Sequence, residues 1–360
     1  MRARPPRVAL ASGNVFGHAG RHLMATILDV AREAGVGIGT VSRVLNDSPL
    51  VSAGTRQRVV AAIERLGYQP SPIARAFGRG RTDTLEVLIP MFAEAFVLEI
   101  LRGIQDALVD TDYTLLVRTV EDAADRERVY QECCGRGRAD GVLLVWMAPT
   151  EALLDRLSAH GLHPVLVNAV HPRAWSIGVD HDAAAQRAAT YCLGLGHVRL
   201  GLIDRREDPF EPSSPGICAR GFATALAEAG HDAPADQQRL ADPSAAAGAA
   251  ALNALLAAPE APTAVIVGSE AQALGALEAA RTAGKRVPQD LSLVGYNDTR
   301  VSRDLGLTTV RLPLRELGRV ATETFLSIQA EPGAPPEVRY VPTELVARRT
   351  CGPPPADGRE

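Results

Sequence analysis

Apolar side chains follow two different periods along this chain. Between residues 26 and 67 they recur every three or four residues in three short stretches, which predicts three amphipathic helices. From Leu85 onward, apolar runs of five to seven residues alternate with helical stretches. Because strands that alternate with helices form parallel sheets, the pattern predicts a small all-α head followed by an α/β body.

Capping residues mark the helix boundaries of the head. Thr26 followed by Asp29 is typical of a capping box, and Gly35 supplies the turn that follows the first helix. Ser52 is expected to cap the third helix and Gly67 to close it. The residues expected to face the core are Ile27, Val30, Ala31, Ala34, Val41, Val44, Leu45, Val59, Val60, Ile63 and Leu66.

The second helix of the head presents small, hydroxyl and basic residues on its outward face. They are Ile38, Gly39, Thr40, Ser42, Arg43 and Asn46. Small residues allow a close approach to DNA, hydroxyls bond phosphates or base edges, and an arginine bonds guanine through two hydrogen bonds. A plain three-helix bundle with a solvated polar face is the alternative, and composition alone leaves it open.

The body contains seven runs that are predicted to be strands, at residues 85–90, 113–119, 141–146, 164–169, 200–204, 263–268 and 291–296. Helices are expected near residues 98–108, 126–134, 183–193, 221–229, 245–256 and 274–283. This pattern predicts two parallel sheets in two lobes. Ligands of such folds bind in the cleft at the carboxyl ends of the strands.

Charge is distributed unevenly along the chain. The 360 residues have a net charge of −4, but residues 1–23 carry +4, residues 24–84 carry +3 and the remainder carries −11. A basic head on an acidic body fits a polyanion that binds the head only, although a head of +3 is weak support by itself. Five cysteines without metal-ligand spacing indicate free thiols in a reducing cytoplasm.

No motif in the sequence indicates catalysis, a nucleotide or a metal. Phosphate-binding loops, a nucleophile elbow and a His-Glu-x-x-His pattern are all missing. We therefore expect no enzyme, no catalytic residue, no metal and no cofactor. Residues 1–23 show no periodicity and too short an apolar stretch for a secretory signal, so we interpret them as a disordered leader or a start assigned before the true one at Met24.

The stretch DVAREAGVGIGTVSRVLN resembles the helix-turn-helix signature of the LacI/GalR repressor family, and the likeness continues through VSAGTRQRVVAAIERLGYQP. The resemblance implies a DNA-binding domain at residues 24–69 and a hinge helix with its linker at residues 70–84. Besides the outward residues of the second helix, the implied DNA contacts are Thr26, Ser71, Ala74 and Phe77. Phe77 stands where the family has a leucine wedge; the alternative is that Phe77 packs on the body.

The body resembles the periplasmic-binding-protein-like sensor of the same family, through segments such as ADGVLL, IGVDHDAAA and VPQDLSLVGYND. The resemblance implies a body at residues 85–350 whose chain crosses between the lobes three times. The first lobe is expected at residues 85–180 and 312–341, and the second at residues 181–311 and 342–350. Residues 351–360 are expected to be a tail.

Most positions that the resemblance implies for an effector depart from the family's sugar-binding pattern. The expected effector-binding residues are Met91, Phe92, Phe96, Trp146, Asp180, Arg220, Ser269 and Asn297. Several acids and amides that would hold vicinal hydroxyls are replaced, so an ordinary sugar is a poorer fit than is usual for the family. The aromatic residues favour a more apolar pocket, with core packing as their commoner alternative.

Together these features predict a cytoplasmic, homodimeric transcriptional regulator. We expect a repressor that binds a near-palindromic operator in double-stranded DNA under the control of a small-molecule effector. A solute-binding protein of a transporter is the alternative from another class, disfavoured by the head and by the missing signal peptide. An α/β enzyme with a DNA-binding head and a regulator without effector control are further interpretations.

Overall fold

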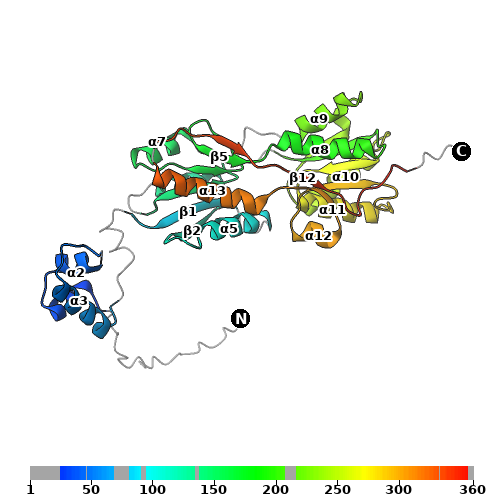
Figure 1. Cartoon of the computed structure of the whole chain (residues 1–360). Helices are drawn as coiled ribbons and strands as arrows, with labels where there is room; N and C mark the ends of the chain where they lie inside the picture. The colour runs from blue at the N-terminus through cyan, green and yellow to red at the C-terminus, as the bar shows by residue number, and fades with distance from the viewer. Residues whose placement is uncertain are drawn as a thin grey trace, which may run out of the picture. The chain divides into compact units, whose positions relative to one another are not determined.

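The structure is a computed structural model that describes residues 25–45, 47–68, 81–90, 95–133, 138–206, 216–331 and 333–355. The chain divides into two units, one within residues 1–80 and the other within residues 81–360. The first is a small helical head, and the second is an α/β body with two parallel sheets in two lobes (Figure 1). The predicted fold class is confirmed.

The head consists of three helices, α1 (Ile27–Ala34), α2 (Ile38–Leu45) and α3 (Ala53–Leu66). The capping box at the start of α1 is present: the Thr26 side chain accepts from the backbone of Asp29, and the Asp29 side chain accepts from the backbone of Thr26. Ser52 caps α3 as predicted. Gly35 and Gly67 end α1 and α3 in the left-handed conformation, at φ values of 63° and 58°.

Most of the predicted core residues of the head are buried, among them Val30, Val41 and Val59. Val60 is the exception, because its side chain is 41% exposed and the buried position on α3 is Ala62 instead. Neighbouring helical residues point about 100° apart, so the core-facing stripe that contains Val59 continues at residues 62, 63 and 66 and leaves Val60 outside.

The first lobe of the body is built on a six-stranded sheet in the order β11-β5-β4-β3-β1-β2, with every neighbouring pair parallel. Its strands are β1 (Thr84–Pro90), β2 (Thr114–Val120), β3 (Gly141–Val145), β4 (Val165–Val167), β5 (Trp175–Gly178) and β11 (Val338–Tyr340). One face packs against α5 (Ala95–Leu108) and α13 (Leu314–Ala330), and the other against α6 (Ala123–Cys133) and α7 (Glu151–Ala159).

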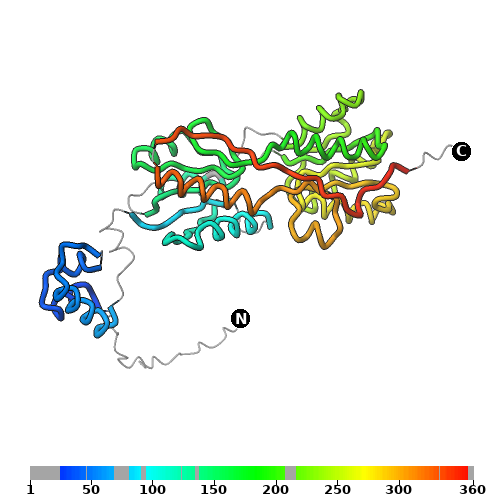
Figure 2. The backbone as a smooth tube through the Cα atoms, viewed as in Figure 1, coloured from blue at the N-terminus to red at the C-terminus, as the bar shows by residue number. Residues whose placement is uncertain are grey.

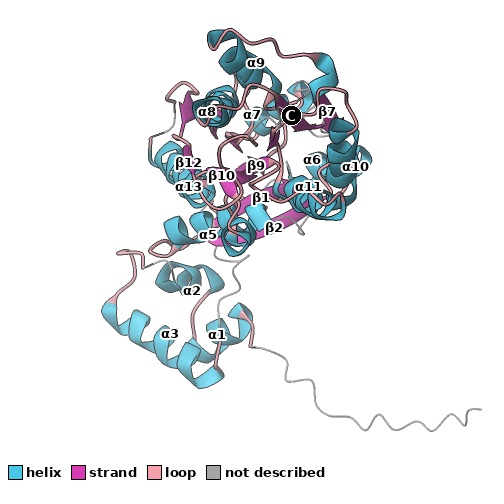
Figure 3. Cartoon of the chain, turned by 90° about the vertical axis from the view of Figure 1, so that its right-hand side faces the viewer, coloured by secondary structure: helices cyan, strands magenta, loops and turns pink. Residues whose placement is uncertain are grey.

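The second lobe has a six-stranded sheet in the order β12-β10-β9-β8-β6-β7, in which only the pairing of β10 with β12 is antiparallel. Its strands are β6 (Leu200–Arg205), β7 (Gln238–Ala241), β8 (Ala264–Val267), β9 (Ser292–Asn297), β10 (Thr308–Arg311) and β12 (Glu344–Val346). The helices are α8 (His181–Gly194), α9 (Ala219–Glu228), the 3₁₀ turn η1 (Ala235–Gln237), α10 (Ala245–Leu256), α11 (Glu270–Thr282) and α12 (Arg300–Leu305). The pair α8 and α9 lies across the sheet from the pair α10 and α11 (Figure 3).

Three connections join the lobes. The chain leaves the first sheet after β5 to begin α8, returns from β10 to α13, and crosses once more from β11 to β12 (Figure 2). Sheet residues far apart in sequence therefore meet at the boundary between the lobes. Connections of this kind form the hinge of a two-lobed clamshell.

The second lobe extends past residue 350, where the sequence analysis began the tail. Backbone groups of Gly352 bond with His197 at 2.8 Å and with Ser292 at 3.1 Å, and Cys351 packs against the core. His197 is buried, and burial lowers the pKa of its imidazole, which therefore stays neutral and orders this segment through hydrogen bonds. The Pro and Gly composition concealed these contacts, because it carries no hydrophobic period.

Candidate nucleic-acid interface and ligand-binding cleft

The outward face of α2 is the candidate nucleic-acid interface of the head. Ile38, Gly39 and Arg43 are exposed, while Thr40 and Ser42 are half-buried at its edges. The opposite face of α2 holds the buried Val41 and Val44, so packing fixes which residues point outward. This division into an apolar face and a face of small and polar residues leaves the second face available to a partner.

Two other arginines of the head, both on α3, help to hold its helices together. Arg56 of α3 pairs with Asp47 and donates to the Ser48 carbonyl at 2.8 Å, and Arg65 pairs with Glu33. Within the described residues, Arg43 makes no such bond. Its guanidinium is therefore a cation on the exposed helix face that the fold of the head does not use.

Thr26 lies at the N-terminus of α1, where its side chain has a structural task. Its hydroxyl donates to the Asp29 carboxylate at 2.6 Å, and that bond lowers the pKa of Asp29 together with the bond from the Thr26 backbone. A phosphate at this exposed helix start would meet free backbone N–H groups as well as Thr26. The predicted contacts Asn46, Ser71, Ala74 and Phe77 lie outside the described residues.

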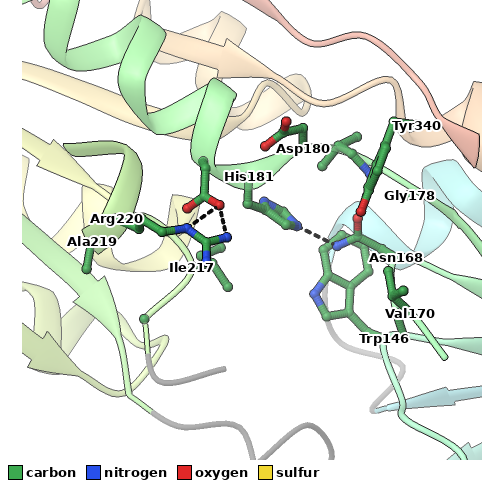
Figure 4. A pocket seen from close by; sticks show the side chains of 14 residues that line it. Trp146, Asn168, Val170, Gly178, Asp180, His181, Ile217, Ala219, Arg220 and Tyr340 are labelled. Carbon is green, nitrogen blue, oxygen red and sulfur yellow. Dashed lines mark hydrogen bonds and ion pairs between the residues drawn. The ribbon is translucent and has the colours of Figure 1, made fainter. Parts of the chain in front are cut away.

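A cavity of about 400 Å³ lies between the two lobes of the body. From the first lobe it is lined by Trp146 and Asn168, which directly follow β3 and β4, and from the second lobe by the loop and helix start at residues 216–220 (Figure 4). Trp146 and Asn168 both have positive φ values, 55° and 58°. Residues other than glycine rarely adopt this conformation, and such strain clusters at binding sites.

One hydrogen bond in the cleft joins the lobes. The Asn168 amide of the first lobe lies 2.9 Å from Nε2 of His181, the first residue of α8. The Nδ1 atom of His181 faces the Tyr296 hydroxyl of β9 at 3.5 Å. Burial and then the charge of Arg205 lower the pKa of His181 to about 4, so the imidazole is neutral near pH 7 and accepts from Asn168.

The charged residues around His181 are arranged by the starts of α8 and α9. Asp180 caps α8 by accepting from the Ala183 backbone at 3.0 Å and is exposed. Asp182 pairs with Arg220 of α9, with 2.7 Å between Arg220 Nε and the carboxylate. A Cβ atom on Gly221 would lie 2.0 Å from the Asp182 carbonyl oxygen, so glycine allows the approach of the two helices that forms this pair.

The buried side chain of Asp204 holds the loop that lines the cleft on the side of the second lobe. Asp204 is 1% exposed and lies one residue before the end of β6. Its carboxylate accepts from the Cys218 backbone at 2.9 Å, just before α9 begins. Burial raises the pKa of Asp204, while backbone N–H donors beside α9 oppose that rise. Gly216 passes beside this carboxylate at a φ of 75°. The carboxylate thus fixes the loop whose residues Ile217, Ala219 and Arg220 face the cavity.

The structure brings three predicted effector residues to this cavity, namely Trp146, Asp180 and Arg220. Phe96 does not line it but packs behind Trp146, with 4.7 Å between the ring centroids. The Ser269 hydroxyl is turned to the N-terminus of α11, where it accepts from the Gln272 backbone at 3.2 Å. The predicted residues Met91 and Phe92 lie outside the described residues.

Asn297 lies on a different cavity, one lined mainly by ion pairs. It is the last residue of β9 and has a φ of 85°, and Asp298, the next residue, has a φ of 60°. Asp298 is held by Arg311 at 2.7 Å and by Arg348 at 2.6 Å. The turn after β9 therefore separates Asn297 from the cleft that holds His181.

Sequence analysis missed Asn168, His181 and Tyr340 as lining residues. Asn168 and His181 had a usable signal, because both stand at or just beyond the carboxyl ends of strands. Tyr340 belongs to β11, a three-residue strand with every side chain exposed, which has no apolar run to reveal it.

The described residues hold neither a metal-binding cluster nor a membrane-spanning helix. They contain no group of three or more His, Cys, Asp or Glu residues placed to hold a metal ion. Among the helices described, none has the length and apolar character needed to cross a membrane. None of the described cysteines, Cys133, Cys192, Cys218 and Cys351, forms a disulfide bond.

Two protein-family models match the chain. The model of bacterial regulatory proteins of the lacI family matches residues 26–71, and the model of a periplasmic binding protein-like domain matches residues 189–351. The first match contains all three helices of the head. The second contains most of the second lobe together with α13 and β11 of the first.

Individual relatives match nearly the whole length of the chain. Catabolite control protein A of Priestia megaterium is 32% identical over 301 residues, which cover 82% of this chain and 90% of that protein. The HTH-type transcriptional repressor PurR of Escherichia coli is 32% identical over 348 residues, or 93% of this chain and 98% of the relative. A crystal structure of the Lac repressor dimer bound to operator and the anti-inducer ONPF is 26% identical with a TM-score of 0.78, covering 91% of this chain and 98% of that one.

Proposed function

The chain belongs to the lacI family of bacterial regulatory proteins, and on that premise we propose that it represses transcription as a homodimer bound to a near-palindromic operator. Its general role is that of a DNA-binding transcriptional regulator. The observation that carries the finer proposal is the exposed face of α2, where Arg43 has no partner among the described residues, whereas Arg56 and Arg65 of α3 are paired. Two-fold symmetry of a dimer requires a correspondingly symmetric pair of half-sites.

In this proposal α2 enters the major groove. Arg43 bonds a guanine, while Ile38 and Gly39, which have no side-chain donor, allow close approach and apolar contact with thymine methyl groups. The remaining proposed contacts are Thr26, Thr40, Ser42 and Asn46 from the head and Ser71, Ala74 and Phe77 from the following segment. Phe77 is proposed to wedge between central base pairs in the minor groove.

We also propose that a small molecule in the interlobe cleft controls the affinity for DNA. Support comes from the cavity beside the three connections between the lobes and from the bond between Asn168 and His181 across it. A ligand shifts the balance between open and closed lobes only by its differential affinity for the two. Because the partner is chromosomal DNA, we place the protein in the cytoplasm.

A solute-binding protein of a transporter is not favoured. Its body would have the same fold, but it would have no use for the head, and the full-length relatives are regulators of transcription. The described residues that line the cleft also offer no arrangement of nucleophile and base that would favour an enzyme.

Selection from random duplex DNA tests the proposal. The full chain and its Arg43→Ala variant are compared at one salt concentration, because nonspecific affinity depends steeply on salt. Arg281→Ala, which changes an exposed arginine of α11 in the body, is the matched control. We expect the full chain and the control to enrich a two-fold-symmetric site and Arg43→Ala to lose discrimination at one base pair of each half-site. Failure of the unaltered chain to enrich any symmetric site, with or without metabolite mixtures, would contradict the proposal.

A further inference from the structure

The charge lining the interlobe cleft is negative. Its described lining contains two acids, one histidine and one arginine: Asp180, Asp182, His181 and Arg220. Arg220 is paired with Asp182, and His181 is neutral near pH 7 because its pKa is lowered to about 4. Asp180 therefore remains as the one uncompensated charge among the described lining residues. Its carboxylate is exposed and, within the described residues, accepts only the capping bond from Ala183.

Charges beside the cleft do not reverse this balance. At the end of β6, Arg206 is paired with Asp242 at 3.0 Å, and Arg205 also has an interaction partner. The negative charge of Asp180 would repel an anionic ligand from this cleft and attract a cation to it.

Aromatic and aliphatic side chains form part of the walls of the cleft, beside its polar residues. Trp146, Tyr340, Ile217 and Val170 line the cavity together with small residues. Rings of this kind bind flat apolar groups, and their faces attract cations. A ring with an attached charge would therefore find both a surface on which to stack and the carboxylate of Asp180.

Trp146 also contributes a hydrogen-bond donor, its indole N–H, to the cleft. It is 4% exposed, its indole nitrogen faces the open cleft, and the described residues contain no acceptor bonded to it (Figure 4). Because this N–H is open to the cleft and is not bonded within the described residues, it is available to an acceptor on a ligand. Asn168 is already engaged on both sides, through its amide nitrogen with His181 and through its oxygen with the Val179 backbone at 3.3 Å.

We propose that the effector is an organic cation, an amine attached to a flat ring that also carries a hydrogen-bond acceptor. The ammonium group binds Asp180, the ring lies against Trp146 and Tyr340, and the acceptor takes the Trp146 N–H. This inference rests on the proposed role of the cleft as an effector site.

Three compounds of equal shape test the charge requirement. Tyramine, tyrosol and 3-(4-hydroxyphenyl)propionate share a hydroxyphenylethyl group and end in an ammonium, a hydroxyl and a carboxylate. Their binding to the full chain without DNA is measured by calorimetry at concentrations up to about 10 mM, which detects a Kd of about 1 mM. We expect tyramine to bind at least about tenfold more tightly than the other two.

Two variants assign that preference to residues. Asp180→Asn retains a good helix cap and removes the charge, so it should weaken tyramine about tenfold and leave tyrosol unchanged. Asp232→Asn, at an exposed position outside the cavity, is the matched control and should change neither. Trp146→Phe keeps a ring and removes the N–H, so it should weaken tyramine and tyrosol equally.

The inference is overturned if the carboxylate binds as tightly as tyramine, if Asp180→Asn binds tyramine unchanged, or if none of the three compounds binds. These outcomes are separate from the fate of the proposed function. A chain that enriches a symmetric operator but shows no preference for the cation contradicts the ligand class alone. A chain that binds tyramine yet selects no operator contradicts the regulator proposal instead.

Discussion

Acidification should destabilise the body, and His181 should account for a measurable part of the loss. Its Nε2 atom accepts from Asn168 across the lobes, a bond that only the unprotonated nitrogen makes. Burial, followed by the charge of Arg205, lowers its pKa from 6.5 to about 4, while Asp182 and Asp180 pull it the other way. Near pH 5 the imidazole is therefore neutral in the folded protein but mostly protonated in the unfolded chain.

The sign and size of the effect follow from linkage. Because the folded state has the lower pKa, the unfolded state binds the extra proton, and the free energy of unfolding falls as the pH drops from 6.5 to about 4. The whole difference corresponds to roughly 3 kcal/mol, of which about 2 kcal/mol is lost on going from about pH 7.5 to about pH 5. Above pH 6.5 the contribution is fully present.

Urea unfolding of the full chain at the two pH values measures this loss. Both tryptophans of the chain, Trp146 and Trp175, lie in the first lobe and report its unfolding by fluorescence. His181→Gln removes the titrating group, and His163→Gln, at an exposed position, is the matched control. We expect the unaltered chain and the control to lose about 2 kcal/mol more than His181→Gln. Equal losses in all three proteins would refute the assigned role of His181.

Three substitutions test how the sequence holds the fold together. Thr26→Ala removes the capping box of α1 and should lower the stability of the head by about 1 kcal/mol, read from hydrogen exchange of its helix amides. Val41→Ala opens a void in a fully buried site and should cost about 2 kcal/mol by the same measurement; exchange rates equal to those of the unaltered head would contradict the core assignment. Gly221→Ala places a Cβ atom 2.0 Å from the Asp182 carbonyl oxygen and should lower the free energy of unfolding of the body by about 1–3 kcal/mol in urea. Gly54→Ala, with no atom within 4 Å of its added Cβ, should cause no loss, and similar losses for both glycine variants would show that crowding is not the cause.

The head was predictable from sequence almost to the residue. Thr26, Gly35, Ser52 and Gly67 act through bonds to residues at most five positions away, so the signals for helix ends are complete within short windows. Val60 shows the limit of the same reasoning. It is apolar and adjacent to the true core face, and only the packing of three helices decides which neighbouring position is buried.

In the body, the seven predicted strands are all present, because each contains an apolar run; six of these runs are mostly buried, and that of β2 is half-buried. Five strands were not predicted: β5, β7, β10, β11 and β12. Each has only three or four residues, and some are exposed, as β11 is along its whole length. Their pairing depends on neighbouring strands that are distant in sequence, so no local pattern reveals them.

The residues predicted to line the cleft likewise include some that the structure places there and some that it does not. Trp146 and Asp180, which the family resemblance implied, line the cavity just beyond strand ends, while Ser269 and Asn297 stand at comparable positions and face elsewhere. The Ser269 side chain caps α11, and the positive φ of Asn297 directs its side chain away from the cleft. Which strand ends converge on one cavity depends on sheet order and local backbone turns, neither of which is visible in the pattern of apolar residues.

The sequence by itself determined the helices and caps of the head, the outward residues of α2, the long strands and the two-part architecture. These features follow from periodicity and from contacts between near neighbours. Only the tertiary structure decided that Asn168 meets His181, that Arg220 is neutralised by Asp182, and that Asp180 is left without a counter-charge among the described residues of the cleft. The physical reason is that charge balance and burial depend on distances between residues that parallel strands and the connections between the lobes bring together from distant parts of the chain.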